Sequence, residues 1–289
     1  MKPPVVLKIG GELLENPKHL EGVVESIAAV RTLVPLAVVH GGGREIDAAL
    51  HAAGIEKRQV DGLRITDEAT LAIAVSVLAG AVNTRFVAAL GVAGVPAVGL
   101  TGADARCGLS VRASAHRTTG GANVDLGLVG EPSDRADVGL LRTLMQNTYV
   151  PVIACIGVDE QGHLLNVNAD VLAAHLAQKL SATRLVMAGA TAGLLDSDGT
   201  TIPVLEASSI AELIDRRTAT AGMIAKLRAC EHAIRGGVGE ILIVDGRSGD
   251  SSTSSGSRRA SRGDPIRTAM VGDAPAGATH IVAGSRVQV

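Results

Sequence analysis

The stretch Val5-Val6-Leu7-Lys8-Ile9-Gly10-Gly11 decides the fold, because an apolar, β-branched run ends there directly in two glycines. The same order returns in Leu36-Ala37-Val38-Val39-His40-Gly41-Gly42-Gly43. Continuous apolar runs of this kind are typical of strands that are buried on both faces of a sheet. Glycines after a strand allow a sharp turn and a close approach of the backbone to a ligand. Two such units predict an α/β fold whose loops gather at the carboxyl edge of a parallel sheet.

Short apolar runs alternate with helical patterns along the rest of the chain. We expect strands at residues 95–100, 124–129, 150–156, 184–187, 240–244 and 279–283. Apolar residues at helical spacing predict helices at residues 45–53, 68–90, 140–145, 171–180, 210–215 and 223–235. This alternation predicts a three-layer αβα sandwich with a mainly parallel central sheet. We see no internal repeat and no clear linker, so residues 1–289 are expected to form a single domain.

The composition excludes several classes of function. The 289 residues include one Tyr, one Phe and no Trp, so the chain cannot offer an aromatic platform for stacking bases. The 27 basic and 29 acidic residues give a formal net charge of −2, which also argues against a nucleic-acid partner. The composition therefore favours a binding site built from backbone, aliphatic side chains and a few charges.

Cysteine usage and hydropathy predict a cytoplasmic protein. The cysteines Cys107, Cys155 and Cys230 are odd in number and form no CxxC pair, so free thiols in a reducing cytosol are expected. The apolar run near the N-terminus is too short for a signal peptide. No other stretch reaches about 18 apolar residues without interruption by charge, so no membrane partner is expected.

Glycine turns follow three of the expected strands, at Gly10-Gly11, Gly41 to Gly43 and Gly99 to Gly102. Backbone N–H groups in such turns can bind an anion, although any one of them could simply be a tight turn. The sequence contains no GxxxxGK[ST], no GxGxxG with its acidic partner, no GxSxG and no HExxH. The sequence therefore argues against P-loop, dinucleotide-binding, hydrolase and zinc-site proteins. The three glycine turns together still favour an anionic ligand.

Four charged residues lie beside these turns. Lys8 ends an apolar strand, where it could extend to solvent or neutralise a phosphate. Asp170 opens a helix, where a helix cap is an equally good interpretation. Lys226 is expected in the first turn of a helix, where a cation opposes the helix dipole, so a functional reason is favoured. Arg64 has the forked geometry that suits a carboxylate.

The ordered set of these segments resembles the amino-acid kinase family. The matching segments span the chain up to Gly246 and are Lys8-Ile9-Gly10-Gly11, His40-Gly41-Gly42-Gly43, Asp61-Gly62-Leu63-Arg64, Gly99-Leu100-Thr101-Gly102, Asp125-Leu126-Gly127-Leu128-Val129-Gly130, Tyr149-Val150-Pro151-Val152-Ile153, Asn166-Val167-Asn168-Ala169-Asp170 and Gly222-Met223-Ile224-Ala225-Lys226. The resemblance implies ATP-dependent phosphorylation of the γ-carboxylate of N-acetyl-L-glutamate to N-acetyl-γ-glutamyl phosphate, a step of arginine biosynthesis. It also implies an N-terminal lobe of about 1–180 for acetylglutamate and dimerisation, and a C-terminal lobe of about 181–289 for ATP.

The resemblance assigns a role to each matching residue. Lys8 and Lys226 would flank the transferred phosphoryl group, and Asp170 would hold both lysines. Gly10, Gly11 and Gly43 would donate N–H groups to phosphate oxygens. Acetylglutamate would lie against Gly42, Gly43, Arg64 and Asn166, and the nucleotide against Gly10, Gly11, Gly189, Ala190, Thr218, Ala219 and Thr220. Mg²⁺ would arrive with ATP, held mostly by phosphates and water, with no metal site on the protein itself.

Three features depart from the family pattern. Gly189 stands where the family usually has an acidic residue, and residues 248–261 are a Ser-, Gly- and Arg-rich insertion expected to be a flexible loop. The chain also starts directly with the first strand, which favours a homodimer without arginine feedback, with the helix at 68–90 as its interface. Two other functions stay open. One is a sister kinase for a carrier-linked aminoadipate or glutamate, and the other is a catalytically weakened homologue that binds a metabolite.

Overall fold

The computed structural model describes residues 2–118, 120–196, 198–215, 221–247 and 264–284. Its centre is an eight-stranded sheet in the order β14-β16-β15-β13-β1-β2-β10-β5. All neighbours in this sheet pair in parallel except β15 and β16. The strands are β1 (Val5–Ile9), β2 (Leu36–His40), β5 (Ala97–Thr101), β10 (Val150–Ala154), β13 (Arg184–Gly189), β14 (Val204–Glu206), β15 (Glu240–Asp245) and β16 (Thr279–Val282). The mainly parallel sheet that the sequence predicts is confirmed.

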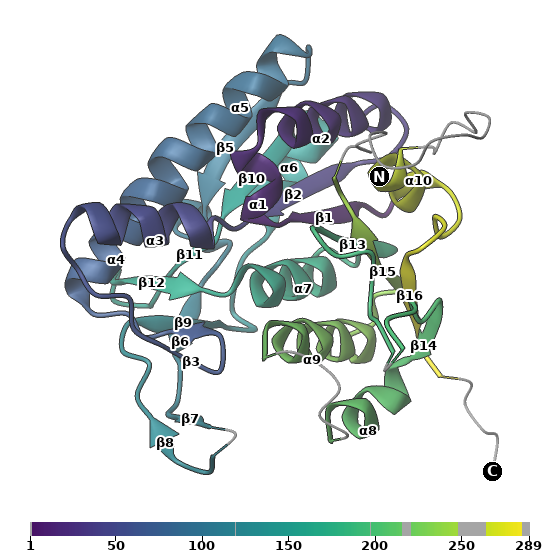
Figure 1. Cartoon of the computed structure of the whole chain (residues 1–289). Helices are drawn as coiled ribbons and strands as arrows, with labels where there is room; N and C mark the ends of the chain where they lie inside the picture. Colours follow the sequence, from purple (N-terminus) through teal and green to yellow (C-terminus); the bar gives the residue numbers. More distant parts are fainter. Residues whose placement is uncertain (1, 119, 197, 216–220, 248–263, 285–289) are drawn as a thin grey trace.

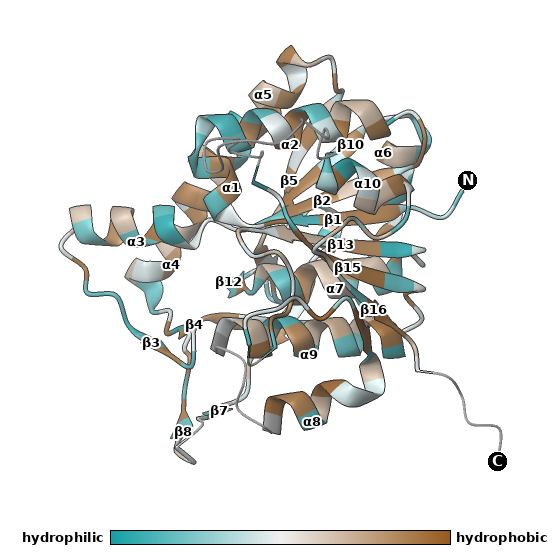
Figure 2. Cartoon of the chain, turned by 45° about the vertical axis from the view of Figure 1, so that its right-hand side comes forward, coloured by the Kyte–Doolittle hydropathy of each residue, from teal (hydrophilic) through white to brown (hydrophobic). Residues whose placement is uncertain are grey.

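Helices cover both faces of the sheet and complete the sandwich (Figure 1). One face packs against α1 (Gly11–Glu15), α2 (Pro17–Val30), α5 (Asn83–Val92) and α10 (Pro265–Val271). The other face packs against α3 (Gly43–Ala52), α6 (Gly139–Gln146), α7 (Ala169–Lys179), α8 (Ile210–Asp215) and α9 (Ala221–Arg235). Figure 2 shows the apolar residues concentrated on the strands and on the inner sides of these helices. Burial of that apolar surface is the main force that holds the layers together.

Alternation along β1 decides which side chain reaches which layer. Val5, Leu7 and Ile9 join the core under α2, whereas Val6 joins the core under α7. Successive side chains of a strand point to opposite faces. Lys8 therefore projects from the sheet on the same side as Val6, toward α7 and α9.

Smaller sheets extend the molecule beyond the carboxyl ends of β2 and β10. One has four strands in the order β11-β12-β9-β6, and two others are hairpins, β3-β4 and β7-β8. Figure 1 shows them gathered beside α3 and α4 (Glu68–Val75), with the β7-β8 hairpin projecting outward. The strands are β3 (Gln59–Val60), β4 (Leu63–Arg64), β6 (Ser110–Arg112), β7 (His116–Arg117), β8 (Asn123–Val124), β9 (Val129–Pro132), β11 (Ile156–Val158) and β12 (Leu164–Val167).

A long helix begins at Glu68 and ends at Val92, close to the predicted range of 68–90. It contains α4 (Glu68–Val75), a π-helical turn at Ser76–Val82, and α5. Its buried side chains form a row on every fourth residue, at Thr70, Ala74, Leu78, Val82, Phe86 and Leu90, and Asn83 beside this row is buried as well. In a plain α-helix such a row drifts by about 40° per step, because four residues exceed one turn of 3.6. The wider π turn reverses that drift and keeps the row facing the sheet.

This helix qualifies as a membrane span by length and composition alone, with 28% of its most apolar window buried. The finding differs from the expectation that no such stretch exists. The core helix of a water-soluble protein passes the same test. Most of its exposed face carries small residues rather than the large apolar ones that would face lipid.

Several sequence expectations were wrong in detail. The strand expected at 150–156 stops at Ala154, because β11 starts at Ile156 and pairs antiparallel with β12 in another sheet. Of the strand expected at 124–129, only the two end residues lie in strands, β8 and β9; between them Gly127 has a positive φ and forms an isolated bridge with Thr66. The helices α2 and α10 and the strand β14 were missed. The loop expected at 248–261 lies outside the described residues.

Candidate active site

The turns after β1, β2 and β13 meet at one edge of the sheet. Ile9 pairs with His40 on one side and with Ala188 on the other, so the glycines that follow these strands are neighbours. Gly11 and Gly42 are in direct contact, since a Cβ on Gly11 would lie 2.6 Å from the Gly42 Cα. This contact requires glycine at position 11, whereas a Cβ on Gly42 would lie 2.8 Å from the Leu78 side chain. The contact joins the two turns into one surface rich in backbone groups.

Three charged side chains converge beside this surface. Lys8 Nζ lies 2.9 Å from Asp170 Oδ1, and Lys226 Nζ lies 3.0 Å from Asp170 Oδ1 and 3.2 Å from Oδ2. Their side chains are only 11%, 12% and 14% exposed for Lys8, Asp170 and Lys226 respectively. One carboxylate thus holds two lysines from elements that are far apart in sequence, as the family resemblance implies.

Helix positions explain how this triad forms and remove two alternatives. Asn168 caps α7 by accepting the N–H groups of Asp170 and Val171, so Asp170 is not the cap and its side chain is available to the lysines. Lys226 lies in the second turn of α9, since that helix runs from Ala221. The argument from an opposed helix dipole was therefore wrong, and the ion pair with Asp170 is the reason for the placement.

Burial and mutual contact set the pKa values of the triad. Burial alone would raise the pKa of Asp170, but attraction by Lys8 and Lys226 holds it well below its usual range. Burial alone would lower the pKa of Lys8, but Asp170 and, to a smaller extent, Glu12 raise it above its ordinary value. Burial and repulsion by Lys8 lower the pKa of Lys226. Asp170 is thus the group that favours the charged form of both lysines.

Arg64 lies beside the Gly41–Gly43 turn and uses Nη2 for its hydrogen bonds, while Nη1 forms none among the described residues. Its Nη2 donates to Asp47 Oδ1 at 2.5 Å and to the Gly43 carbonyl at 3.2 Å. Its Nη1 is buried and has no partner within the described residues. A buried guanidinium nitrogen without a partner is costly, and the forked geometry of the guanidinium suits an incoming acceptor such as a carboxylate.

Asn166 and Asp47 complete this side of the site. Asn166, on β12, donates through Nδ2 to Thr66 Oγ1 at 3.1 Å. Thr66 follows Arg64 by two residues in the sequence, so this bond places Asn166 near Arg64. Asp47, on α3, binds both Arg64 and Lys57, the latter at 2.8 Å. Sequence reasoning missed Asp47, although its place one helical turn after Gly43 was a usable signal. The predicted residues Gly42, Gly43, Arg64 and Asn166 thus surround one region.

The predicted nucleotide residues are only partly free to bind phosphate. The Gly10 N–H donates to the Ala188 carbonyl at 2.9 Å, so the predicted donation from Gly10 to a phosphate is wrong for this structure. The Ala190 N–H donates to Glu12 Oε1 at 3.0 Å. Gly189 lies next to the same carboxylate. Thr218, Ala219 and Thr220 lie outside the described residues. Glu12 was missed, because nothing local distinguishes it from a helix-surface residue.

The third glycine turn, Gly99 to Gly102, has a packing role instead of the expected anion-binding one. The missing side chain of Gly99 makes room for the Asn83 amide, and a Cβ on Gly102 would lie 2.6 Å from the Ile156 carbonyl. Asn83 donates to the Val152 carbonyl and contacts His40 Nε2, both at 3.0 Å. His40 is fully buried, and burial lowers its pKa to about 4. A neutral histidine thus supports the Gly41–Gly43 turn from below.

Comparison with known proteins decides the family. The sequence matches the amino acid kinase family over residues 3–245. The chain belongs to that family. Curated relatives named acetylglutamate kinase include those of Brachyspira hyodysenteriae, 38% identical, and Caulobacter sp., 40% identical; each match covers 84% of this chain and 83% of the relative.

Solved structures share the same fold. The smu.665 protein of Streptococcus mutans superposes with a TM-score of 0.72 at 26% identity, covering 85% of this chain and 96% of that one. N-acetylglutamate synthase from Neisseria gonorrhoeae, complexed with coenzyme A and N-acetyl-glutamate, gives a TM-score of 0.77 at 24% identity, covering 98% of this chain and 60% of that one. At that identity, the second likeness shows the fold alone.

Proposed function

We propose that this chain phosphorylates the γ-carboxylate of N-acetyl-L-glutamate with ATP, a step of arginine biosynthesis. The observation that carries the proposal is the buried pair Lys8 and Lys226 on one carboxylate, beside the joined glycine turns. The curated relatives named acetylglutamate kinase support the choice of substrate. Three buried free cysteines are consistent with a reaction in the reducing cytoplasm.

The chemistry needs charge stabilisation rather than a base. The acceptor carboxylate is ionised at neutral pH, so its oxygen can attack the γ-phosphorus directly. A bond forms between that oxygen and phosphorus while the bond from phosphorus to the β,γ-bridging oxygen breaks, and ADP leaves with the electron pair. Such transfers depend on positioning and on cations near the equatorial oxygens. Lys8 and Lys226 fit that role, and Asp170 prevents their mutual repulsion from driving them apart.

The two lobes would divide the substrates between them. Acetylglutamate would lie near Gly42, Gly43 and Asn166, with its α-carboxylate on the free Nη1 of Arg64. ATP would approach the edge formed by β1 and β13, near Gly11 and Gly189. Bound Mg²⁺ supplies charge neutralisation on the phosphates. Here the adenine must rest on aliphatic side chains and backbone, given the scarcity of aromatic residues.

The direct test is ADP release with N-acetylglutamate, combined with trapping of the acyl phosphate as a hydroxamate. We expect turnover with free N-acetylglutamate and none with glutamate, whose amino group is charged. Absence of product at millimolar N-acetylglutamate would refute the proposal. Binding of N-acetylglutamate by calorimetry without ADP release would indicate a metabolite-binding homologue instead, and product with only a carrier-linked substrate would indicate a sister kinase.

We also propose a homodimer that forms through the long helix. Its exposed face is a row of small residues, Ala72, Ser76, Gly80, Thr84 and Ala88. Val92, at the end of this helix, is 93% exposed. A flat row of small residues lets two helices approach closely. Among the described residues, a Cβ on Gly80 would meet nothing within 4 Å, so Gly80→Arg would extend from an open position into the proposed interface.

We expect Gly80→Arg to convert a dimer into a monomer in sedimentation experiments. Glu25→Arg, on the exposed side of α2, is the control and should leave the dimer intact. A wild-type protein that sediments as a monomer, or a Gly80→Arg variant that stays dimeric, would exclude this helix as the interface.

A further inference from the structure

The carboxylate of Glu12 lies in the middle of the edge where the nucleotide phosphates are proposed to bind. Glu12 belongs to the short helix α1 that follows the Gly10–Gly11 turn. Its Oε1 accepts the Ala190 N–H at 3.0 Å, which ties α1 to the residue that follows β13. Its negative charge also acts on Lys8. One acidic side chain therefore connects both predicted nucleotide turns and one of the two cations.

Two glycines leave the space that this carboxylate occupies. A Cβ on Gly10 would lie 2.6 Å from the Glu12 Cδ, and a Cβ on Gly189 would lie 3.1 Å from Oε1. Gly189 does not have a positive φ, so its backbone does not itself require glycine. A side chain at 189 would thus press against the end of the Glu12 side chain, which would have to shift by a few tenths of an ångström.

The charges around the triad determine which form of a nucleotide this edge accepts. Lys8 and Lys226 supply two positive charges, and Asp170 and Glu12 supply two negative ones, so this set is neutral as a whole. A free polyphosphate entering here meets Glu12 without a surplus of cations to offset it. A polyphosphate that carries a divalent cation brings the compensating charge with it. Magnesium prefers oxygen ligands and commonly binds one or two carboxylates together with substrate phosphates.

We propose that the Glu12 carboxylate makes this site select the magnesium complex of the nucleotide over the free nucleotide. The Ala190 N–H holds Oε1, while Oε2 has no hydrogen-bond partner among the residues that the structure describes. Ala190 therefore contributes by fixing Glu12 rather than by donating to a phosphate. This inference rests on the proposed function, since it needs a nucleotide at this edge.

The test measures nucleotide affinity rather than turnover. Calorimetry compares binding of a non-hydrolysable ATP analogue with excess Mg²⁺ and with a chelator, in the wild type and in Glu12→Gln. We expect Glu12→Gln to reduce the preference for the magnesium complex by about tenfold or more, which corresponds to removal of one unit charge near a partly buried site. An unchanged preference would overturn the inference. An equal gain in affinity for both forms would also overturn it, because Glu12 would then merely compete with phosphate.

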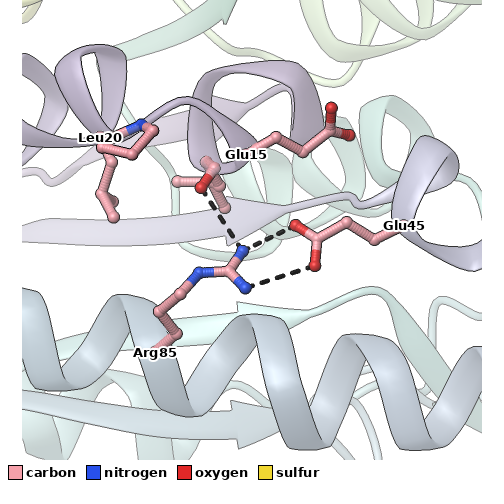
Figure 3. A pocket seen from close by; sticks show the side chains of 6 residues that line it. Glu15, Leu20, Glu45 and Arg85 are labelled. Carbon is pink, nitrogen blue, oxygen red and sulfur yellow. Dashed lines mark hydrogen bonds and ion pairs between the residues drawn. The ribbon is translucent and has the colours of Figure 1, made fainter.

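Glu15 provides the matched control, because it lies on the same helix but lines a different cavity. That groove, of about 340 Å³, is bordered by Leu20, Glu45 and Arg85 (Figure 3). Glu15→Gln should leave the preference for magnesium unchanged. If the wild type binds no nucleotide at all, the proposed function fails. If it binds nucleotide but Glu12→Gln does not change the preference for the magnesium complex, only the present inference fails.

A relocated carboxylate gives a second, independent test. Among the residues that the structure describes, Glu12 supplies the one atom within 4 Å of a Cβ at position 189, so Glu12→Ala makes room there for the Cβ of Gly189→Asp. We expect Glu12→Ala to lose the preference for the magnesium complex and Glu12→Ala/Gly189→Asp to regain part of it. A double variant that shows no recovery, while remaining folded by circular dichroism, would contradict the role of a carboxylate at this place.

Discussion

The triad of Lys8, Asp170 and Lys226 and the cluster of Arg64, Asp47 and Lys57 differ in one informative way. In the triad each lysine already has a carboxylate oxygen at 2.9–3.0 Å. In the Arg64 cluster Asp47 binds Nη2, while Nη1 is buried and has no partner in the part of the chain that the structure describes. In a complete cluster, such as the triad, every cation already has an anionic partner, which suits stabilisation of a charge that develops only in the transition state. In an incomplete cluster, such as that of Arg64, one donor has no partner, which suits binding of a charge that the ligand carries from the start.

The largest expected effect falls on the complete cluster. Lys8→Ala or Lys226→Ala should reduce kcat at least ~10²-fold, because each removes a cation from the developing charge. The KM for N-acetylglutamate should change little, since the triad is not proposed to hold the resting substrate. Steady-state kinetics give both numbers. Retained kcat in either variant would break the contrast drawn above.

The incomplete cluster should respond in the opposite way. Arg64→Ala should raise the KM for N-acetylglutamate by roughly 10²-fold with a smaller loss of kcat, because it removes a charged hydrogen bond present in the ground state. Asp47→Asn, which weakens the hold on Arg64, should raise KM by less, on the order of tenfold. An Arg64→Ala variant with normal KM and low kcat would show that Arg64 acts in the transition state as the lysines do.

The triad also predicts the alkaline limb of the pH profile. Lys226 is the lysine with the lowered pKa, so kcat should fall as pH rises through a value below 10.5, the ordinary value for lysine. Asp170→Asn removes the attraction that favours both ammonium groups, and the limb should move to lower pH. A limb that stays in place in Asp170→Asn would show that the lysines do not set it.

The smallest expected effect on activity concerns His40, beneath the glycine turn. Its folded pKa of about 4 lies below its ordinary value of 6.5, so the unfolded chain binds the proton first as pH falls. Stability should therefore be lost between pH 6.5 and 4, by up to about 3 kcal/mol through this group. Denaturant unfolding of the wild type and His40→Gln measures it. An equally steep loss in the variant would exclude His40 as the source.

The sequence predicted the parts that depend on local pattern and chain order. The β1 and β2 runs with their glycines predicted the sheet edge. The resemblance named Lys8, Asp170 and Lys226, which the fold brings into contact, and Arg64, which lies beside the Gly43 carbonyl; their roles stay predictions. Glu12 and Asp47 escaped because their importance comes only from the Ala190 N–H and the Arg64 guanidinium, which tertiary folding brings to them.

Other errors had the same kind of physical cause. The strand after Ala154 changes sheets without a local signal, since Cys155 and Ile156 look like a continuation of the apolar run. The sequence suggested that Gly99 is part of an anion-binding turn, but in the structure the missing side chain leaves space for the Asn83 amide. A glycine in a sequence does not show whether its free space is for a ligand or for a neighbouring side chain.

The contact between Gly11 and Gly42 has a consequence for how such a site can change over evolutionary time. The two turns touch backbone to backbone, with no side chain between them. The spacing between these turns therefore cannot be adjusted by exchanging one side chain for another. Residues at the rim, such as Arg64 and Asn166, can be replaced to accept a different acid, while the position of one turn against the other stays the same.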